Sequence, residues 1–172
     1  NLSREFLYLA RHMQPGEAAK VKALEIPGVY TTREYRRYYP SGEVAGHVLG
    51  FTDVDDAGQE GLELAFDHWL AGEDGAKRVI QDNLGRVVQD VESIRTARPG
   101  RDLVLSIDLR IQYLAYRELK GAMREFNAKS GSVVVVDVKT GEVLAMVNMP
   151  SFNPNDRAQF DVSRYRNRAA TD

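Results

Sequence analysis

The sequence predicts an α+β fold, and three of its features carry that prediction. Helix-like and strand-like apolar patterns succeed one another along its 172 residues. Glycine clusters interrupt the first half, and a nearly unbroken run of valines over 132–138 is typical of a buried strand in the second half. With 43% hydrophobic and 28% charged residues, the composition is that of a globular chain and not of a disordered one.

The composition also bounds the functional class. A net charge of −2 argues against a dedicated nucleic-acid binder, because such domains are usually strongly basic. The absence of cysteine excludes a disulfide framework and a thiolate metal site. No apolar run reaches the roughly 18 residues of a membrane span, and no signal peptide is visible. The chain begins inside an expected helix, so we expect it to be a piece of a longer protein whose membrane anchor lies elsewhere.

The first third of the chain is predicted to be helical and then extended. Apolar spacing predicts one helix over 3–13 and a second over 15–24, with Pro15 in the first turn of the second helix. Residues 29–35 follow the break at Pro27-Gly28 and are rich in β-prone residue types.

A short helix and a hairpin come next. Apolar residues at helical spacing predict a helix over 62–70 that ends near Gly72. Segments 76–80 and 87–94 alternate as strands do, and the Asp82-Asn83-Leu84-Gly85 sequence between them is a turn signal. The two segments therefore predict a β-hairpin.

The Arg98-Pro99-Gly100 tripeptide is the best candidate for a linker. We place a domain boundary there, which divides the chain into residues 1–100 and residues 101–172. A short strand over 103–107 is expected to begin the second part.

The second part is predicted to hold one long helix and one hairpin. Asp108 is placed to cap a helix over 108–126, whose apolar residues form a stripe with a period of 3.6 residues. The valine strand over 132–138 is expected to be buried on both faces. It returns over 143–147 after a tight turn at Lys139-Thr140-Gly141.

Three glycine-bearing clusters stand close together in the first half. Glycine loses more conformational entropy on folding than any other residue, so such clusters are costly inside regular helix or strand. We interpret them as fixed turns that set the positions of Arg37, His47 and Glu63. The clusters are Arg37-Tyr38-Tyr39-Pro40-Ser41-Gly42, Gly46-His47-Val48-Leu49-Gly50 and Gly58-Gln59-Glu60-Gly61-Leu62-Glu63. The candidate structural or partner-binding residues in them are Arg37, Tyr39, Pro40, Gly42, His47, Gly50, Gly58, Gly61 and Glu63.

The three clusters together resemble the non-catalytic module of class B penicillin-binding proteins. The second part resembles the start of the transpeptidase domain of the same family, and the two resemblances span 26–172. The pattern is most similar to the division-specific enzymes of Gram-negative bacteria. The end of the chain, 167–172, is similar to the segment just before that family's Glu-Pro-Gly-Ser nucleophile motif. The resemblance of the second part rests on Leu105-Ser106-Ile107-Asp108, Gln112, the valine strand, Thr140-Gly141-Glu142-Val143-Leu144-Ala145-Met146, Pro150-Ser151-Phe152 and Pro154-Asn155.

The resemblance implies both an architecture and an activity. Residues 1–100 would form a mixed pedestal-type or dimerisation module, and residues 101–172 the first helix and β-hairpin of the transpeptidase domain. The whole protein would cross-link septal peptidoglycan by serine acyl transfer on stem peptides, and β-lactams would acylate it. The implied partners are a SEDS-type glycosyltransferase and other division proteins, at the periplasmic face of the inner membrane. No cofactor or metal is implied.

The catalytic residues of that chemistry are not among these 172. The family uses a Ser-x-x-Lys nucleophile together with Ser-x-Asn and Lys-Thr-Gly motifs. No serine of this chain has a lysine three residues later. Lys139-Thr140-Gly141 and Ser151-Phe152-Asn153 imitate the other two motifs, but they stand in reversed order and ahead of the place expected for the nucleophile. We interpret them as a hairpin turn and a Pro/Asn loop, and we expect the nucleophile downstream of Asp172.

The histidines and a group of aspartates have simple structural interpretations. The histidines are too dispersed for a metal site, and His47 is expected to be a hydrogen-bonded structural residue. The aspartates suggest a cation loop, but the bidentate Glu of an EF-hand is missing, which favours a solvated turn. The residues concerned are His12, His47, His68, Asp53, Asp55 and Asp56.

Two further groups allow a functional and a structural interpretation. Glu60 and Glu63 could act as a carboxylate pair in glycosidic chemistry, although their place at a helix start favours interaction with the helix dipole. The arginines and tyrosines of 33–39 could stack on single-stranded nucleic acid or bind a protein partner. The structural interpretation is an alternating strand that turns one tyrosine face inward. A protein contact is favoured over nucleic acid, which we do not expect as a ligand.

Two rival interpretations of the whole chain remain at this stage. The first is a cell-wall scaffold module without a working transpeptidase. The second is a β-lactam sensor or β-lactamase relative that shares the valine hairpin, against which the glycine clusters argue. The residues after Asp172 would distinguish these from the enzyme.

Two hypotheses follow from the sequence. A partly buried Glu63 needs a partner, and we expect Arg37 or an upstream arginine to supply it. Glu63→Ala would then cost on the order of 3 kcal/mol if the pair is buried. The hairpin over 133–147 is expected to pair with another chain that carries the rest of the domain, to self-associate, or to be poorly ordered, because a two-stranded hairpin is marginal alone.

Overall fold

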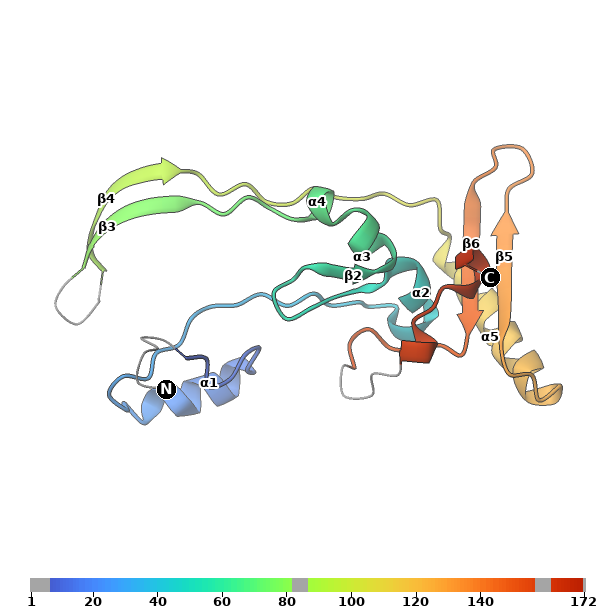
Figure 1. Ribbon diagram of the computed structural model, residues 1–172, viewed down its shortest axis with the longest axis horizontal. Coiled ribbons are helices and arrows are strands. Elements are labelled where there is room, and N and C mark those ends of the chain that lie inside the picture. Colours follow the sequence, from blue (N-terminus) through green and yellow to red (C-terminus); the bar gives the residue numbers. More distant parts are fainter. Residues whose placement is uncertain (1–6, 82–86, 157–161, 172) are drawn as a thin grey trace. The chain divides into compact units, whose positions relative to one another are not determined.

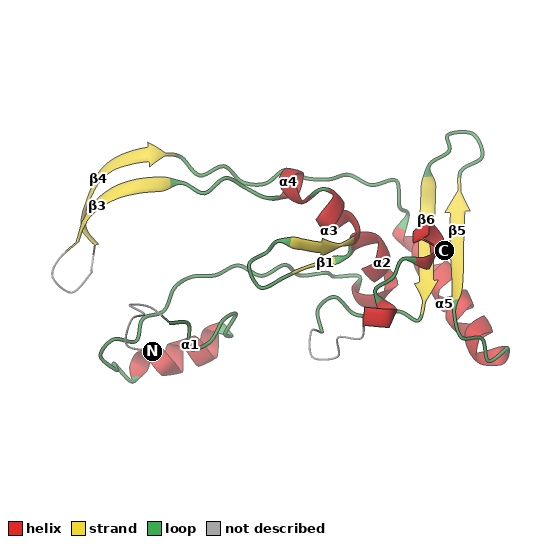
Figure 2. Ribbon diagram, viewed as in Figure 1, coloured by secondary structure: helices red, strands yellow, loops and turns green. Residues whose placement is uncertain are grey.

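The computed structural model describes residues 7–81, 87–156 and 162–171. The chain forms two units, Asn1–Tyr38 and Tyr39–Asp172, and each is described here by itself. Within the described part, the strands form three separate two-stranded antiparallel sheets, and helices lie between them along the chain (Figure 2). The chain is therefore α+β, as the sequence predicts. The domain boundary placed at 100 stays a prediction.

Residues 7–38 of the first unit form one regular element, helix α1 (Pro15–Ala23), which Pro15 opens as predicted. The helix predicted over 3–13 is wrong for residues 7–13, and residues 3–6 lie outside the described part. His12 has a φ of 53°, which is incompatible with a helix, and Glu34 accepts hydrogen bonds from both the Arg11 side chain and the His12 amide. Residues 29–35, all of them described, form no strand, because a strand needs a neighbour to complete its hydrogen bonds.

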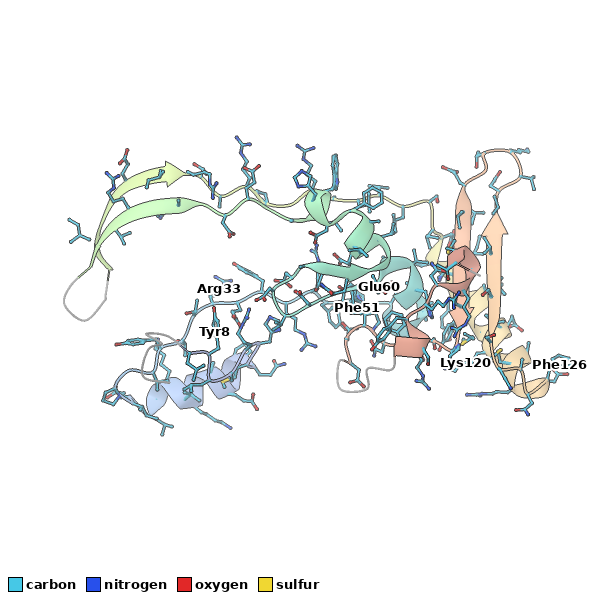
Figure 3. The ribbon with its side chains drawn as sticks, in the orientation of Figure 1. Tyr8, Arg33, Phe51, Glu60, Lys120 and Phe126 are labelled. Atoms are coloured by element: carbon cyan, nitrogen blue, oxygen red, sulfur yellow. The ribbon has the colours of Figure 1, made fainter. Side chains whose placement is uncertain are left out.

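The second unit begins with small elements built on the glycine clusters. A 3₁₀ turn (Gly42–Val44) leads into α2 (Gly46–Leu49). Strand β1 (Phe51–Thr52) pairs with β2 (Gly58–Glu60). Phe51 and Glu60 are partners in this register, and both are labelled in Figure 3.

The helix predicted over 62–70 is divided into two. Helices α3 (Gly61–Ala65) and α4 (Asp67–Leu70) meet at Phe66, whose φ of −117° and ψ of 21° lie outside the helical region. The apolar spacing carries through the break, which explains why the sequence pattern predicts a single helix.

The predicted hairpin is confirmed as β3 (Ala76–Gln81) and β4 (Val87–Arg95), which run side by side in Figure 1. The turn predicted at 82–85 lies outside the described residues. Pairing continues beyond the strands, because the backbone groups of Glu73 and Arg98 exchange hydrogen bonds of 2.8 and 2.9 Å. The amide of Arg101 also donates to the carbonyl of Trp69 at 3.1 Å. The tripeptide predicted as a linker is thus part of a paired segment.

The last part of the second unit contains the long helix and its hairpin. Helix α5 (Leu109–Glu125) is capped as predicted, since the Asp108 carboxylate accepts a hydrogen bond from the Arg110 amide at 2.8 Å. Strands β5 (Gly131–Val136) and β6 (Val143–Met149) pair in an antiparallel register. No strand forms over 103–107, a range that the structure describes in full.

The valine strand is buried on one face only, which corrects the sequence prediction. Val133 and Val135 of β5 are half-buried on the side where Val147 of the partner strand β6 packs against Tyr116 of α5, while Val134 and Val136 are 45% and 46% exposed. The cause is the layer arrangement: α5 covers one face of the two-stranded sheet (Figure 1), and the short helix α6 (Arg168–Thr171) covers the other face only in part, next to Asn148. The near-unbroken apolar pattern is nevertheless that of a strand that would be covered on both sides.

Two further properties concern the described residues. None of their helices is both long enough and apolar enough to cross a membrane. Helix α6 (Arg168–Thr171), which follows a 3₁₀ turn (Val162–Arg164), is the last element in the described part.

We predict that the isolated 172-residue chain self-associates through the open face of the β5–β6 hairpin. Replacing Val134 and Val136 together by lysine should shift the chain toward monomer, because two charges would have to be desolvated in the contact. Size-exclusion chromatography with light scattering measures the state. Val104→Lys, at a 92% exposed position outside the strands, is the matched control and should leave association unchanged. A strictly monomeric parent chain would contradict the prediction.

Candidate functional site at the glycine-rich junction

In the glycine-rich segment, residues 39–63, the chain turns where the backbone of Gly50 packs closely against the backbone of Glu60 and Gly61. Gly50 has a φ of 77°, and a Cβ atom built on it would lie 1.7 Å from the carbonyl oxygen of Glu60. Gly61 has a φ of 59°, and its Cβ atom would lie 2.6 Å from the amide nitrogen of Gly50. No side chain fits at either position, so the expectation of fixed turns is confirmed at Gly50 and Gly61. It is wrong at Gly46 and Gly58, which lie in helix α2 and strand β2.

Tyr39 anchors the start of this segment. Its amide donates to Oδ1 of Asn155 at 3.0 Å, and its carbonyl accepts from Nδ2 of the same side chain at 2.8 Å. The Tyr39 hydroxyl accepts a hydrogen bond from the Thr52 amide at 3.2 Å. Tyr39 is 4% exposed and belongs to a cluster with Phe51, Phe152 and Tyr165. The side-chain amide of Asn155 thus forms the same pair of hydrogen bonds with the Tyr39 backbone that a neighbouring strand would form.

The aromatic cluster joins residues that are far apart in sequence. The ring centroids of Phe51 and Phe152 lie 5.9 Å apart, and that of Tyr165 lies 5.0 Å from Phe51 and 4.9 Å from Phe152. Edge-to-face and tilted ring pairs of this kind stabilise the fold beyond the effect of the apolar area that they bury. The cluster therefore fixes the glycine-rich segment against the segment that follows β6.

His47 is a structural histidine, as the sequence interpretation expects. It is 5% exposed, and its Nε2–H donates to the carbonyl of Arg164 at 2.7 Å. Its ring also packs edge-on against Phe152 at 5.1 Å. Burial lowers the pKa of His47 and outweighs the hydrogen bond to the Arg164 carbonyl, and the positive charge of Arg168 lowers it further. The imidazole is therefore neutral near pH 7 and acts as a hydrogen-bond donor.

Gln112 holds three elements together and is fully buried. Its Nε2 donates to the carbonyls of Val44 and Met146, both at 2.8 Å, and its Oε1 accepts from the Met146 amide at 2.8 Å. The side chain comes from α5, one partner from the 3₁₀ turn and the other from β6. Gln112 is thus the direct link between the glycine-rich segment and the helix–hairpin unit.

A charged group lies at the edge of the same junction. The Glu43 carboxylate accepts hydrogen bonds from Lys120 Nζ at 3.2 Å and from Ser151 Oγ at 3.0 Å. Lys120, labelled on α5 in Figure 3, also donates to the Tyr116 hydroxyl at 2.7 Å. Burial works against ionisation of Glu43, but hydrogen bonds from Tyr116, Ser151 and Lys120 hold its pKa below the usual range. Glu43 is thus stabilised as a carboxylate.

The predicted site residues are brought together in part. Within the second unit, the junction contains Tyr39, Gly42, His47, Gly50, Gly58, Gly61 and Glu63. Pro40 is exposed. Arg37 belongs to the first unit, so its pairing with Glu63, which is 9% exposed, stays a prediction. The partner-binding role of these residues also stays a prediction.

The fragments that imitate catalytic motifs have structural roles. Asp137 accepts hydrogen bonds from the amides of Lys139 and Thr140, and Gly141 has a φ of 76°, which makes the segment the predicted tight turn. Ser151 binds Glu43 through its hydroxyl. The Asp53 carboxylate likewise closes a turn by accepting from the amides of Asp55 and Ala57. No group of acidic or histidine side chains in the described residues could hold a metal ion.

The arginine–tyrosine segment does not form the alternating strand of the structural interpretation. Tyr35 and Tyr38 are 71% and 74% exposed, and only Tyr39 is buried among the tyrosines of 33–39. Arg33 lies over the ring of Tyr35, 5.2 Å from its centroid. These residues, all described, lie in an irregular segment without strand pairing.

Sequence reasoning did not identify several polar residues as parts of the junction, although Gln112, Asn155 and Asn167 stand in the segments that carry the family resemblance. Glu43, Gln112, Asn148, Asn155 and Asn167 each hold a backbone or side-chain group of another element. One signal was available: Gln112 stands four residues before Tyr116 on the buried face of α5, where a polar residue requires buried partners.

Family models match most of the chain. The model of the Penicillin-binding Protein dimerisation domain matches residues 3–105. The chain belongs to the class B penicillin-binding proteins. The model of the Penicillin binding protein transpeptidase domain follows it and matches residues 131–172.

Curated relatives match the chain from end to end. It is 49% identical to the peptidoglycan D,D-transpeptidase FtsI of Escherichia coli K12, and the match covers 100% of this chain and 29% of that protein. It is 45% identical to the probable peptidoglycan D,D-transpeptidase PbpC of Pseudomonas aeruginosa, over 100% of this chain and 30% of that protein. This penicillin-binding protein chain therefore spans less than a third of the length of these relatives.

Solved structures share the fold. Apo penicillin-binding protein 3 of Mycobacterium tuberculosis matches with a TM-score of 0.58 and 35% identity, over 74% of this chain and 24% of that chain. A structure described as the structural coordination of polymerization and crosslinking by a peptidoglycan synthase complex matches with a TM-score of 0.65 and 28% identity. That match covers 83% of this chain and 29% of the other.

We predict that Gln112→Leu lowers the free energy of unfolding by about 3 kcal/mol, because it leaves the buried Val44 carbonyl and Met146 amide without their partner. Urea unfolding followed by circular dichroism measures the change. Gln59→Leu, the same substitution at an exposed position, is the control and should stay within about 0.5 kcal/mol of the parent. Equal losses in the two variants would contradict the role of Gln112.

We predict that Arg37 and Glu63 are energetically coupled. A double-mutant cycle of Arg37→Ala and Glu63→Ala, read from thermal or urea unfolding, isolates the pairwise energy. A coupling above about 0.5 kcal/mol supports the pair, since unrelated sites add to within that value. Additive losses would mean that another group supports Glu63.

Proposed function

We propose that the whole protein is a peptidoglycan D,D-transpeptidase and that residues 1–172 are its non-catalytic scaffold together with the start of its transpeptidase domain. The observation that carries the proposal is the end-to-end similarity to FtsI of Escherichia coli at 49% identity, with the two family models in the same order along the chain. The boundary between the two parts is proposed near residue 100.

The proposed chemistry is serine acyl transfer. A serine in a Ser-x-x-Lys motif after Asp172 attacks the acyl-D-Ala-D-Ala end of a stem peptide, the lysine takes its proton, and backbone amides hold the oxyanion. D-Ala leaves, and a second stem peptide accepts the acyl group. This chemistry requires no metal or cofactor. A β-lactam acylates the same serine.

The part played by residues 1–172 is to hold that site. The junction joins the glycine-rich segment to α5, β6 and the segment before α6 through buried amides and aromatic rings. Such contacts give the transpeptidase domain a fixed base, which a scaffold module requires. They place no acid, base or nucleophile in a position to react.

The proposed setting is septal wall synthesis at the periplasmic face of the inner membrane. The similarity of the sequence pattern to division-specific enzymes supports a septal role. A peptidoglycan synthase complex that couples polymerization and crosslinking is among the similar structures. A membrane glycosyltransferase of the SEDS type and other division proteins, which the family resemblance implies, are the proposed partners.

We predict that the full-length protein is labelled covalently by a fluorescent penicillin and that residues 1–172 alone are not. Denaturing electrophoresis with in-gel fluorescence gives the result. Full-length protein with the serine of its Ser-x-x-Lys replaced by alanine is the control and should also be unlabelled. A full-length protein that stays unlabelled would overturn the proposed activity, and labelling of the 172-residue chain would overturn its assignment as non-catalytic.

A further inference from the structure

Asn148 is an almost completely buried amide, 1% exposed, on strand β6. Its Oδ1 accepts hydrogen bonds from Ser132 Oγ at 2.7 Å and from the Ala169 amide at 2.8 Å. Its Nδ2 donates to Oδ1 of Asn167 at 2.8 Å. Two of these three bonds reach the segment at the start of α6, which is distant in sequence.

Helix α6 is held from outside at its first turn. The first amides of a helix have no partner inside it and are usually capped by the residue just before the helix. Here the Ala169 amide is capped by Asn148 from β6. The local residue, Asn167, instead accepts from the amides of Ala170 and Thr171 through its carbonyl, both at 3.0 Å. The position of the first turn of α6 is therefore fixed by a side chain of the sheet as well as by hydrogen bonds within the helix.

The glycine-rich segment holds the same stretch of chain from a second side. The His47 ring donates to the carbonyl of Arg164, three residues before Asn167. The Asn167 side chain in turn donates to the His47 carbonyl and approaches the Met146 sulfur, both at 3.5 Å. Asn167 thus connects His47 of the glycine-rich segment with Asn148 of β6.

We propose that Asn148 and Asn167 form a positioning pair that sets the path along which the chain leaves α6. The proposal rests on the function proposed above, in which the acylated serine follows Asp172. The pair then fixes the geometry of that serine without touching the substrate. A fully satisfied buried network specifies one arrangement, whereas a displacement of about 1 Å at a reacting group can cost 10²-fold in rate.

Ser132 offers a matched control for this role. Its hydroxyl donates to the same Asn148 oxygen as the Ala169 amide does, but Ser132 lies on β5, and this hydrogen bond does not reach the α6 segment. Ser132→Ala removes one hydrogen bond from Asn148 and leaves both links to the α6 segment in place. A general loss of packing around Asn148 would slow acylation in Ser132→Ala as well as in variants of Asn148 or Asn167. A loss of positioning would slow acylation only in the variants of Asn148 or Asn167, which lose the links to the α6 segment.

The test uses the full-length protein and three variants, Asn148→Leu, Asn167→Ala and Ser132→Ala. Stopped-flow measurements with a fluorescent penicillin separate the noncovalent affinity from the first-order acylation step. We expect Asn148→Leu and Asn167→Ala to slow the acylation step by about 10- to 100-fold and to leave the noncovalent affinity within about twofold. Ser132→Ala should stay within about twofold of the parent in both. Thermal melting of each variant, measured in parallel, shows that the folded protein is being compared.

The outcomes separate the two proposals. A parent protein that is not acylated overturns the proposed function, and this inference falls with it. An acylated parent whose folded Asn148→Leu and Asn167→Ala variants react at the parental rate overturns the positioning pair alone. If Asn148→Leu does not fold, Asn167→Ala decides, because it removes the link to Asn148 while Asn148 keeps its bonds to Ser132 and Ala169.

Discussion

The second unit depends on one buried amide. Gln112 lies on α5 and binds backbone groups of both the 3₁₀ turn at Gly42–Val44 and strand β6. A side-chain amide can donate and accept at the same time, so one residue satisfies three groups that would otherwise be buried without partners. An apolar side chain of the same size would fill the space and leave those groups unpaired. The glycine-rich segment and the helix–hairpin unit therefore meet in a single arrangement.

The same device recurs across the junction. Asn155 pairs with both backbone groups of Tyr39, and Asn148 caps α6 from the neighbouring strand. Each amide completes the hydrogen bonds of an irregular segment that has no strand or helix to do so. Apolar burial supplies much of the stabilisation in the aromatic cluster, but such contacts are weakly directional. The amides supply the direction, which suits a scaffold that must hold a reactive domain in one orientation.

Elements that depend on local interactions were predicted correctly from the sequence, whereas those that depend on distant contacts were not. The cap at Asp108, the β3–β4 hairpin and the turn at Gly141 are local, and their sequence signals were sufficient. The helix expected near His12 and the single helix through Phe66 failed, because backbone geometry at one residue interrupts an apolar pattern that continues past it. The burial of the valine strand was overestimated because periodicity records what a strand can bury and not which layers are present.

By itself, the sequence determined the family, the α+β class, the turns at Gly50 and Gly61 and the lack of a nucleophile within these residues. These depend on residue identity and spacing along the chain, which can be read without coordinates. Only the tertiary structure decided that Gln112, Asn148 and Asn155 are buried and which groups they bind. Their partners lie 34 residues away for Gln112 and Met146 and 116 for Asn155 and Tyr39. A polar side chain shows no preference for such a partner in the sequence, because the free energy that favours its burial exists only once the distant backbone group is in place.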